Sequence, residues 1–197
     1  MDQIQENFNF PITWGSTKYI NAYSFFINSM LVLYDFRPSF LIQYVDFPNP
    51  DDYNRIVINC IDIVPTFLNL PEPLLNETDE VKQRYINDNT LVGVEHPQGM
   101  LITKSKSLNN SFFKLLLLNS VDDDEIFGNI LGYPCAGDTE ITGVKVPMHI
   151  VMSNNQNQEI FSNICLTSNI HKFIEKFNEI NDFVSRINPK LRLKLLD

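Results

Sequence analysis

Apolar side chains recur at intervals of three or four positions between residues 170 and 187. This spacing places them along one face of an α-helix. Ser168 or Asn169 can cap the first turn, and Asn188-Pro189 provides a stop. The pattern predicts an amphipathic helix with an exposed polar face, and its apolar stripe consists of Ile170, Phe173, Ile174, Phe177, Ile180, Val184 and Ile187.

Two more helices are predicted in the first half of the chain. One covers about residues 18–34, where apolar and aromatic residues share a face that suits the core and Ser16 or Thr17 can cap the start. The other covers residues 77–87. It begins with acidic residues, and Lys82 and Arg84 follow, which is the order that the helix dipole favours. Because this second helix is mostly polar, we expect it on the surface.

Alternating apolar positions predict a strand from Val144 to Met152. Pro147 within it cannot donate a backbone hydrogen bond, so we expect this strand at the edge of a sheet. Residues 91–95 and 100–104 flank the turn-like sequence His-Pro-Gln-Gly, which predicts an antiparallel hairpin. A last strand is expected over residues 191–195, where leucines alternate with basic residues that would protect an edge.

Residues 51–64 give conflicting signals. Val57, Cys60, Ile61 and Val64 fit one face of a helix opened by Asn49-Pro50, whereas the many β-branched residues favour a strand. We favour the strand, with residues 39–47 as its partner.

These elements predict an α+β fold with two layers, in which a mainly antiparallel sheet is covered by amphipathic helices. The length of 197 residues is within reach of one core. No linker or internal repeat divides the sequence. We therefore expect a single globular domain over residues 1–197.

Composition narrows the range of partners. The net charge of −9 repels phosphate backbones, so no nucleic acid is expected as a partner. The longest uncharged stretch, residues 19–34, contains several polar residues and is too short to span a membrane, so no membrane association is expected. The first residues are acidic and polar rather than basic and then apolar, unlike an export signal. A soluble, cytoplasmic protein is expected.

Cofactor and metal chemistry find little support in the sequence. The cysteines Cys60, Cys135 and Cys165 have no short spacing, and free thiols are expected. No pair of histidine or cysteine residues has zinc-ligand spacing, and no glycine pattern matches a nucleotide-phosphate loop. We expect neither a cofactor nor a metal.

The segment from Ser120 to Asp138 has the most distinctive sequence. Acidic residues 122–125 favour a helix start, Gly132 fits a C-terminal cap and Pro134 prevents continuation, so a structural interpretation explains nearly every position. In the catalytic alternative, Cys135 is a nucleophile, His149 its base and Asp138 the residue that orients the base. The acidic surroundings would raise the thiol pKa, which disfavours that alternative.

The leading functional hypothesis is a non-catalytic binding or assembly module with a protein partner or a second copy of the chain. No group of residues indicates catalysis more strongly than structure, and the 12% aromatic residues could supply interface anchors. The alternative is a small thiol-dependent enzyme that uses Cys135 with His149. A broad exposed apolar patch would favour the module, and a deep pocket that gathers Cys135, His149 and an acid would favour the enzyme.

Overall fold

The computed structural model describes residues 22–43, 77–153, 159–187 and 192–197. The contacts divide the chain into two compact units, Met1–Lys114 and Leu115–Asp197. The single domain over residues 1–197 stays a prediction. Residues 51–64, for which the sequence left strand and helix open, lie outside the described residues.

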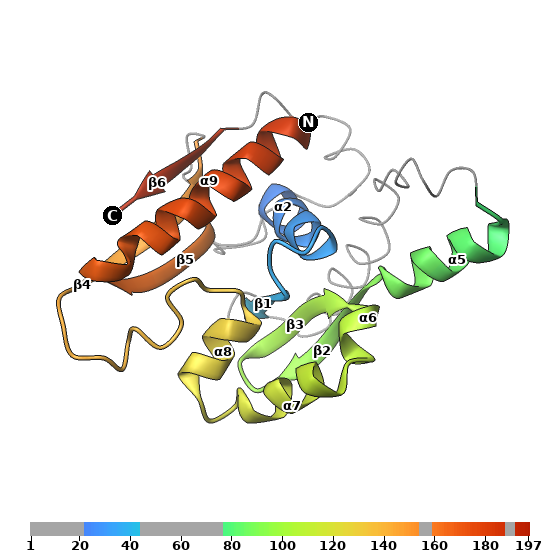
Figure 1. The fold of residues 1–197 in the computed structure, drawn as a ribbon, viewed down its shortest axis with the longest axis horizontal. Coiled ribbons are helices and arrows are strands. Elements are labelled where there is room, and N and C mark those ends of the chain that lie inside the picture. Colours follow the sequence, from blue (N-terminus) through green and yellow to red (C-terminus); the bar gives the residue numbers. More distant parts are fainter. Residues whose placement is uncertain (1–21, 44–76, 154–158, 188–191) are drawn as a thin grey trace. The chain divides into compact units, whose positions relative to one another are not determined.

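The first unit contains a three-stranded antiparallel sheet in the order β1-β3-β2 (Figure 1). Strands β2 (Leu91–His96) and β3 (Gly99–Lys104) form the predicted hairpin, and β1 (Ser39–Gln43) pairs with the other edge of β3. The hairpin prediction is confirmed, and the predicted strand over residues 39–47 is confirmed as far as Gln43.

Helix α2 (Ala22–Leu33) contacts β1 and β3. All residues from Ile27 to Leu33 are buried, so this end of the helix is enclosed rather than amphipathic. Arg37 is buried just after it, where Nη1 donates to Asn28 Oδ1 at 2.7 Å and Nε donates to the Ser39 carbonyl at 2.8 Å. The predicted helix at residues 18–34 is confirmed within the described residues.

Among the described residues, three other helices lie in this unit or at its boundary. Helix α5 (Asp79–Asp88) is mostly exposed, as predicted for residues 77–87. The short α6 (Ser105–Leu108) follows β3 directly. Helix α7 (Ser111–Asn119) contains the boundary between the two units and was not predicted.

The second unit contains another three-stranded antiparallel sheet, in the order β5-β4-β6. Its strands are β4 (Lys145–Met152), β5 (Glu159–Leu166) and β6 (Leu193–Leu196). The predicted strand at residues 144–152 is thus confirmed, but its predicted edge position is wrong, because β4 is central. Proline is tolerated there because β6 pairs only with residues 149–152, which leaves that side of Pro147 outside the ladder.

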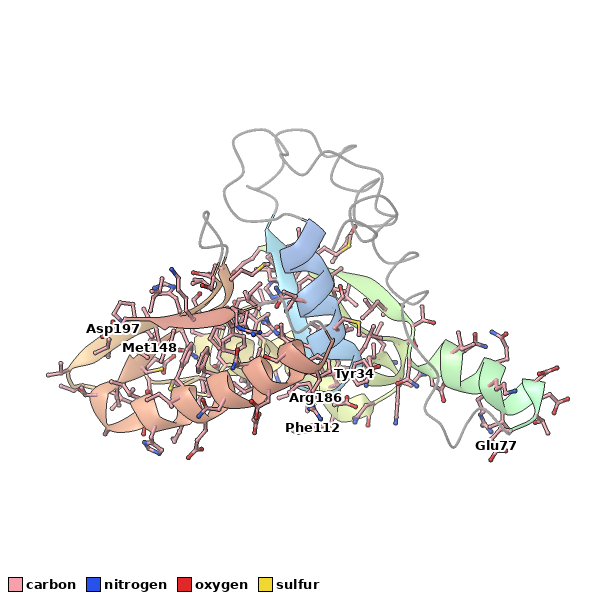
Figure 2. The ribbon with its side chains drawn as sticks, turned by 90° about the horizontal axis from the view of Figure 1, so that it is seen from above. Tyr34, Glu77, Phe112, Met148, Arg186 and Asp197 are labelled. Carbon is pink, nitrogen blue, oxygen red and sulfur yellow. The ribbon has the colours of Figure 1, made fainter. Side chains whose placement is uncertain are left out.

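Helix α9 (Ile170–Ile187) follows the 3₁₀ turn η3 (Thr167–Asn169) and lies beside this sheet in both views (Figures 1 and 2). Its bounds are those predicted. Phe173 is fully buried, and its ring centroid lies 5.8 Å from that of Phe161 on β5. Ile174 is 40% exposed and Phe177 is only half-buried, so the buried stripe is narrower than predicted and passes through Phe173, Ile180 and Val184.

The α+β class and the antiparallel pairing are confirmed. The strands form two small sheets in the described part of the chain, rather than a single sheet. The arrangement in two layers stays a prediction.

Candidate functional site

A short helix and the loop after it form one side of the candidate site in the second unit. Helix α8 (Asp124–Ile130) is capped by Asp123, whose Oδ1 accepts a hydrogen bond from the Ile126 amide at 2.9 Å. Gly132 has a φ of 74° and ends the helix, as the sequence predicts. Gly137 has a φ of 84°, and a Cβ there would meet the Glu125 side chain at 2.9 Å, so the loop needs glycine at this position.

Asp138 ties this loop to β5 and to the turn before α9. Its Oδ2 accepts a hydrogen bond from the Leu166 amide at 2.7 Å. The side-chain amide of Asn169 donates to both carboxylate oxygens, at 2.9 and 3.2 Å. Asp138 is itself buried, so these bonds compensate the removal of its charge from water.

Cys135 and Cys165 are buried, hydrogen-bonded free thiols. Burial raises the pKa of Cys135, the bond with Cys165 offsets part of this rise, and the nearby charge of Asp138 adds to it. Burial also raises the pKa of Cys165 strongly. The Cys135 thiol donates to the Asn169 carbonyl, with 3.7 Å between sulfur and oxygen. Both thiols are therefore protonated at neutral pH and poor nucleophiles.

A pocket of about 300 Å³ lies between this loop and the sheet. Its floor includes Pro147 and His149 of β4 and Ser162 and Ile164 of β5. These four residues share one face, because Pro147 pairs with Ile164 and His149 with Ser162. The opposite side is formed by residues of α8 and of the loop, namely Asp124, Phe127, Gly128, Tyr133, Cys135, Ala136, Gly137 and Thr139.

Glu159 orients His149 in this pocket. Its Oε2 lies 2.8 Å from His149 Nδ1, and its Oε1 accepts a hydrogen bond from the Ser162 hydroxyl at 2.9 Å. A carboxylate only accepts hydrogen bonds, so Nδ1 carries the proton. Within the described part of the chain, His149 Nε2 has no hydrogen-bond partner. The arrangement can present Nε2 to a ligand.

The structure brings two of the three candidate catalytic residues to the same pocket. Cys135 and His149 both line it. The Cys135 thiol, however, is hydrogen-bonded to the Asn169 carbonyl and to the Cys165 thiol. Asp138 is bonded to Leu166 and Asn169, and the carboxylate on His149 belongs to Glu159. A catalytic role for Cys135, His149 and Asp138 stays a hypothesis from the sequence.

Glu159 and Ser162 were not predicted as site residues because strand β5, which carries both, was not predicted. The segment Glu-Ile-Phe-Ser-Asn-Ile-Cys-Leu mixes polar and apolar residues without regular alternation. The available signal was its concentration of β-branched and aromatic residues directly before a helix cap.

Helix α7 carries the second candidate feature, an apolar surface. None of its residues is buried, and Phe112, Leu115 and Leu118 are 66%, 55% and 74% exposed. These three residues are spaced three apart and share one helix face, and we call them the α7 surface. Exposed apolar residues that cluster in this way mark interaction sites.

Comparisons with protein-family models, with curated proteins and with solved structures find no match for this chain. The function must therefore be inferred from the residues that the structure describes. Among these residues, no group of three or more histidine, cysteine, aspartate or glutamate side chains is placed to hold a metal ion. None of the described helices has both the length and the apolar character needed to cross a membrane.

Proposed function

We propose that this protein is a non-catalytic binding module that contacts another protein through the α7 surface. The observation that carries the proposal is the exposure of Phe112, Leu115 and Leu118 on a helix that buries none of its residues. A partner that covered these side chains would remove their apolar area from water, which contributes about 25 cal/mol for each Å². Apolar residues three or four positions apart are also the anchors of helices that bind in a groove.

The charges around the α7 surface indicate what the partner presents. Lys114 is the only charged residue in the helix, and the acidic residues 122–125 follow soon after its end. An apolar groove with a basic rim complements this arrangement. A membrane surface fits less well, because helices that lie on membranes carry several basic residues and favour anionic lipids.

The thiol-dependent enzyme has less support as an alternative. Cys135 is 2% exposed, and burial raises its thiol pKa. No hydrogen bond joins its sulfur to His149 among the described contacts.

Site-specific photocrosslinking in the native cells tests the proposal. A photoreactive benzoylphenylalanine replaces Leu115 or Leu118 in turn, and Val81 of α5 and Ile174 of α9 serve as controls because each is 40% exposed. We expect one discrete protein adduct from both α7 positions and none from the controls.

Three outcomes would contradict the proposal: no adduct, the same adduct from all four positions, or adducts with lipid alone. An adduct of twice the chain mass would identify a second copy as the partner and would support it.

A further inference from the structure

Among the side chains that line the pocket of the second unit, Asp124 is acidic and none is a lysine or an arginine. Residues 115–144 contain six acidic residues, at positions 122, 123, 124, 125, 138 and 140, and no lysine, arginine or histidine. This stretch supplies eight of the residues that line the pocket. A concave site with charges of one sign raises the local concentration of ligands of the opposite sign. The pocket therefore favours a cation and disfavours phosphate and other anions.

The pocket also presents aromatic rings beside an acid. Asp124 lines it together with the rings of Phe127 and Tyr133. The Tyr133 ring is held edge-on against Phe161, with 5.1 Å between the centroids and 77° between the planes. Aromatic faces attract guanidinium and ammonium groups, and they also contact the apolar stem that carries such a group.

The protein places one of its own ammonium groups at this rim. Lys145 Nζ donates to the carbonyl of Thr139, a residue of the pocket wall, at 2.5 Å. A backbone carbonyl of the pocket wall therefore accepts a hydrogen bond from an ammonium group. The bond is exposed, so a ligand cation can compete with Lys145 for the site.

We propose that this pocket binds an organic cation, a guanidinium or ammonium group on a short apolar stem. Asp124 supplies the counter-charge, Phe127 and Tyr133 contact the stem, and His149 Nε2 is available to a hydrogen-bond donor of the ligand. A volume of about 300 Å³ suits a small group of this kind. The site is separate from the α7 surface, and it stands whether or not α7 binds a protein.

Four probes that differ in charge test the pocket in the full-length protein. Butylguanidinium and butylammonium carry the charge, butylurea has nearly the shape of the first without its charge, and pentanoate carries the opposite charge. Isothermal titration gives the Kd values. We expect both cations to bind at least about tenfold more tightly than butylurea, and pentanoate not to bind. Equal affinity for butylguanidinium and butylurea would overturn the proposal.

Matched variants assign the binding to the pocket. Asp124→Asn removes the lining charge and should weaken butylguanidinium binding by about tenfold. Asp182→Asn, on the exposed side of α9, makes the same change outside the pocket and should leave Kd within about twofold. Lys145→Met removes the competing ammonium and should strengthen binding. Equal weakening by the two aspartate variants, or weaker binding by Lys145→Met, would contradict the assignment.

The natural cation can be a free small molecule or the side chain of a protein. Acetyl-arginine-methylamide carries the same guanidinium between two peptide bonds. Tighter binding of this compound than of butylguanidinium indicates an arginine side chain, and weaker binding indicates a free cation. Failure of both cations overturns the site and leaves the photocrosslinking result of α7 unaffected.

Discussion

Helices α7 and α9 show that apolar content and burial are different properties. Six of the nine residues of α7 are phenylalanine or leucine, yet none is buried. Only eight of the eighteen residues of α9 are apolar, yet Phe173, Ile180, Phe183 and Val184 are buried. The difference lies in the arrangement, because in α9 the apolar residues form a stripe between charged residues.

Regular spacing gives α9 one apolar side and one polar side. Its buried stripe faces the sheet, and charged residues such as Glu175 and Asp182 remain in water. In α7, apolar residues extend around the helix, so any one contact leaves some of them exposed. A folded chain retains such a surface at a cost in solubility, which is why we propose that the α7 surface binds a partner.

The largest effect that the comparison predicts is the loss of the Phe173 ring. Phe173→Ala should destabilise the protein by about 3–5 kcal/mol, because this side chain is fully buried and its removal leaves a cavity beside Phe161. Phe177→Ala, four residues later on the same helix, should cost clearly less because Phe177 is half-buried. Unfolding in denaturant measures both, and equal costs would contradict the register of the stripe.

The sequence predicted elements whose spacing has a single interpretation. The bounds of α9, the hairpin of β2 and β3 and the start of α8 within the acidic residues 122–125 all depend on residues close together in the chain. The edge position predicted for β4 failed because it depended on Pro147 alone, and a proline is compatible with a central strand where the neighbouring strand is short.

The candidate site could be predicted only in part. Cys135 and His149 were named, but the carboxylate that orients His149 is Glu159, brought there by the pairing of β4 with β5. Asp138 is closer to Cys135 in the sequence than Glu159 is. Its carboxylate does not orient His149, because it accepts hydrogen bonds from the Leu166 amide and from Asn169. The α7 surface was missed because four consecutive leucines have no periodicity to interpret.

A smaller effect concerns the Cys135 thiol in the loop after α8. Cys135 donates to Asn169, directly before this helix, and burial raises its pKa. In a variant that keeps only this cysteine, alkylation of the native protein should therefore reach its midpoint above the ordinary value of about pH 8.5. The unfolded protein should titrate at that value.

The raised pKa of Cys135 also makes the stability of the folded protein depend on pH. Because the folded-state pKa is raised, the contribution of Cys135 is complete below the unfolded pKa and is lost as the pH rises through the folded pKa. Comparing the parent with Cys135→Ser over this pH range isolates the effect. An alkylation midpoint well below pH 8.5 would indicate a reactive Cys135 thiolate and would favour the thiol-dependent enzyme as the function.

The smallest expected change in stability comes from α7. Phe112→Ala removes the same atoms as Phe173→Ala, but from a side chain that is 66% exposed, so the free energy of unfolding should change by no more than about 0.5 kcal/mol. Phe112→Ala should instead weaken the binding of the partner. It should therefore reduce the yield of the adduct that forms when benzoylphenylalanine replaces Leu118. Densitometry of the adduct and a denaturant titration of the same variant measure the two quantities together. A loss of stability above about 2 kcal/mol would mean that α7 is packed within this protein, and the apolar surface would then belong to the fold rather than to a partner.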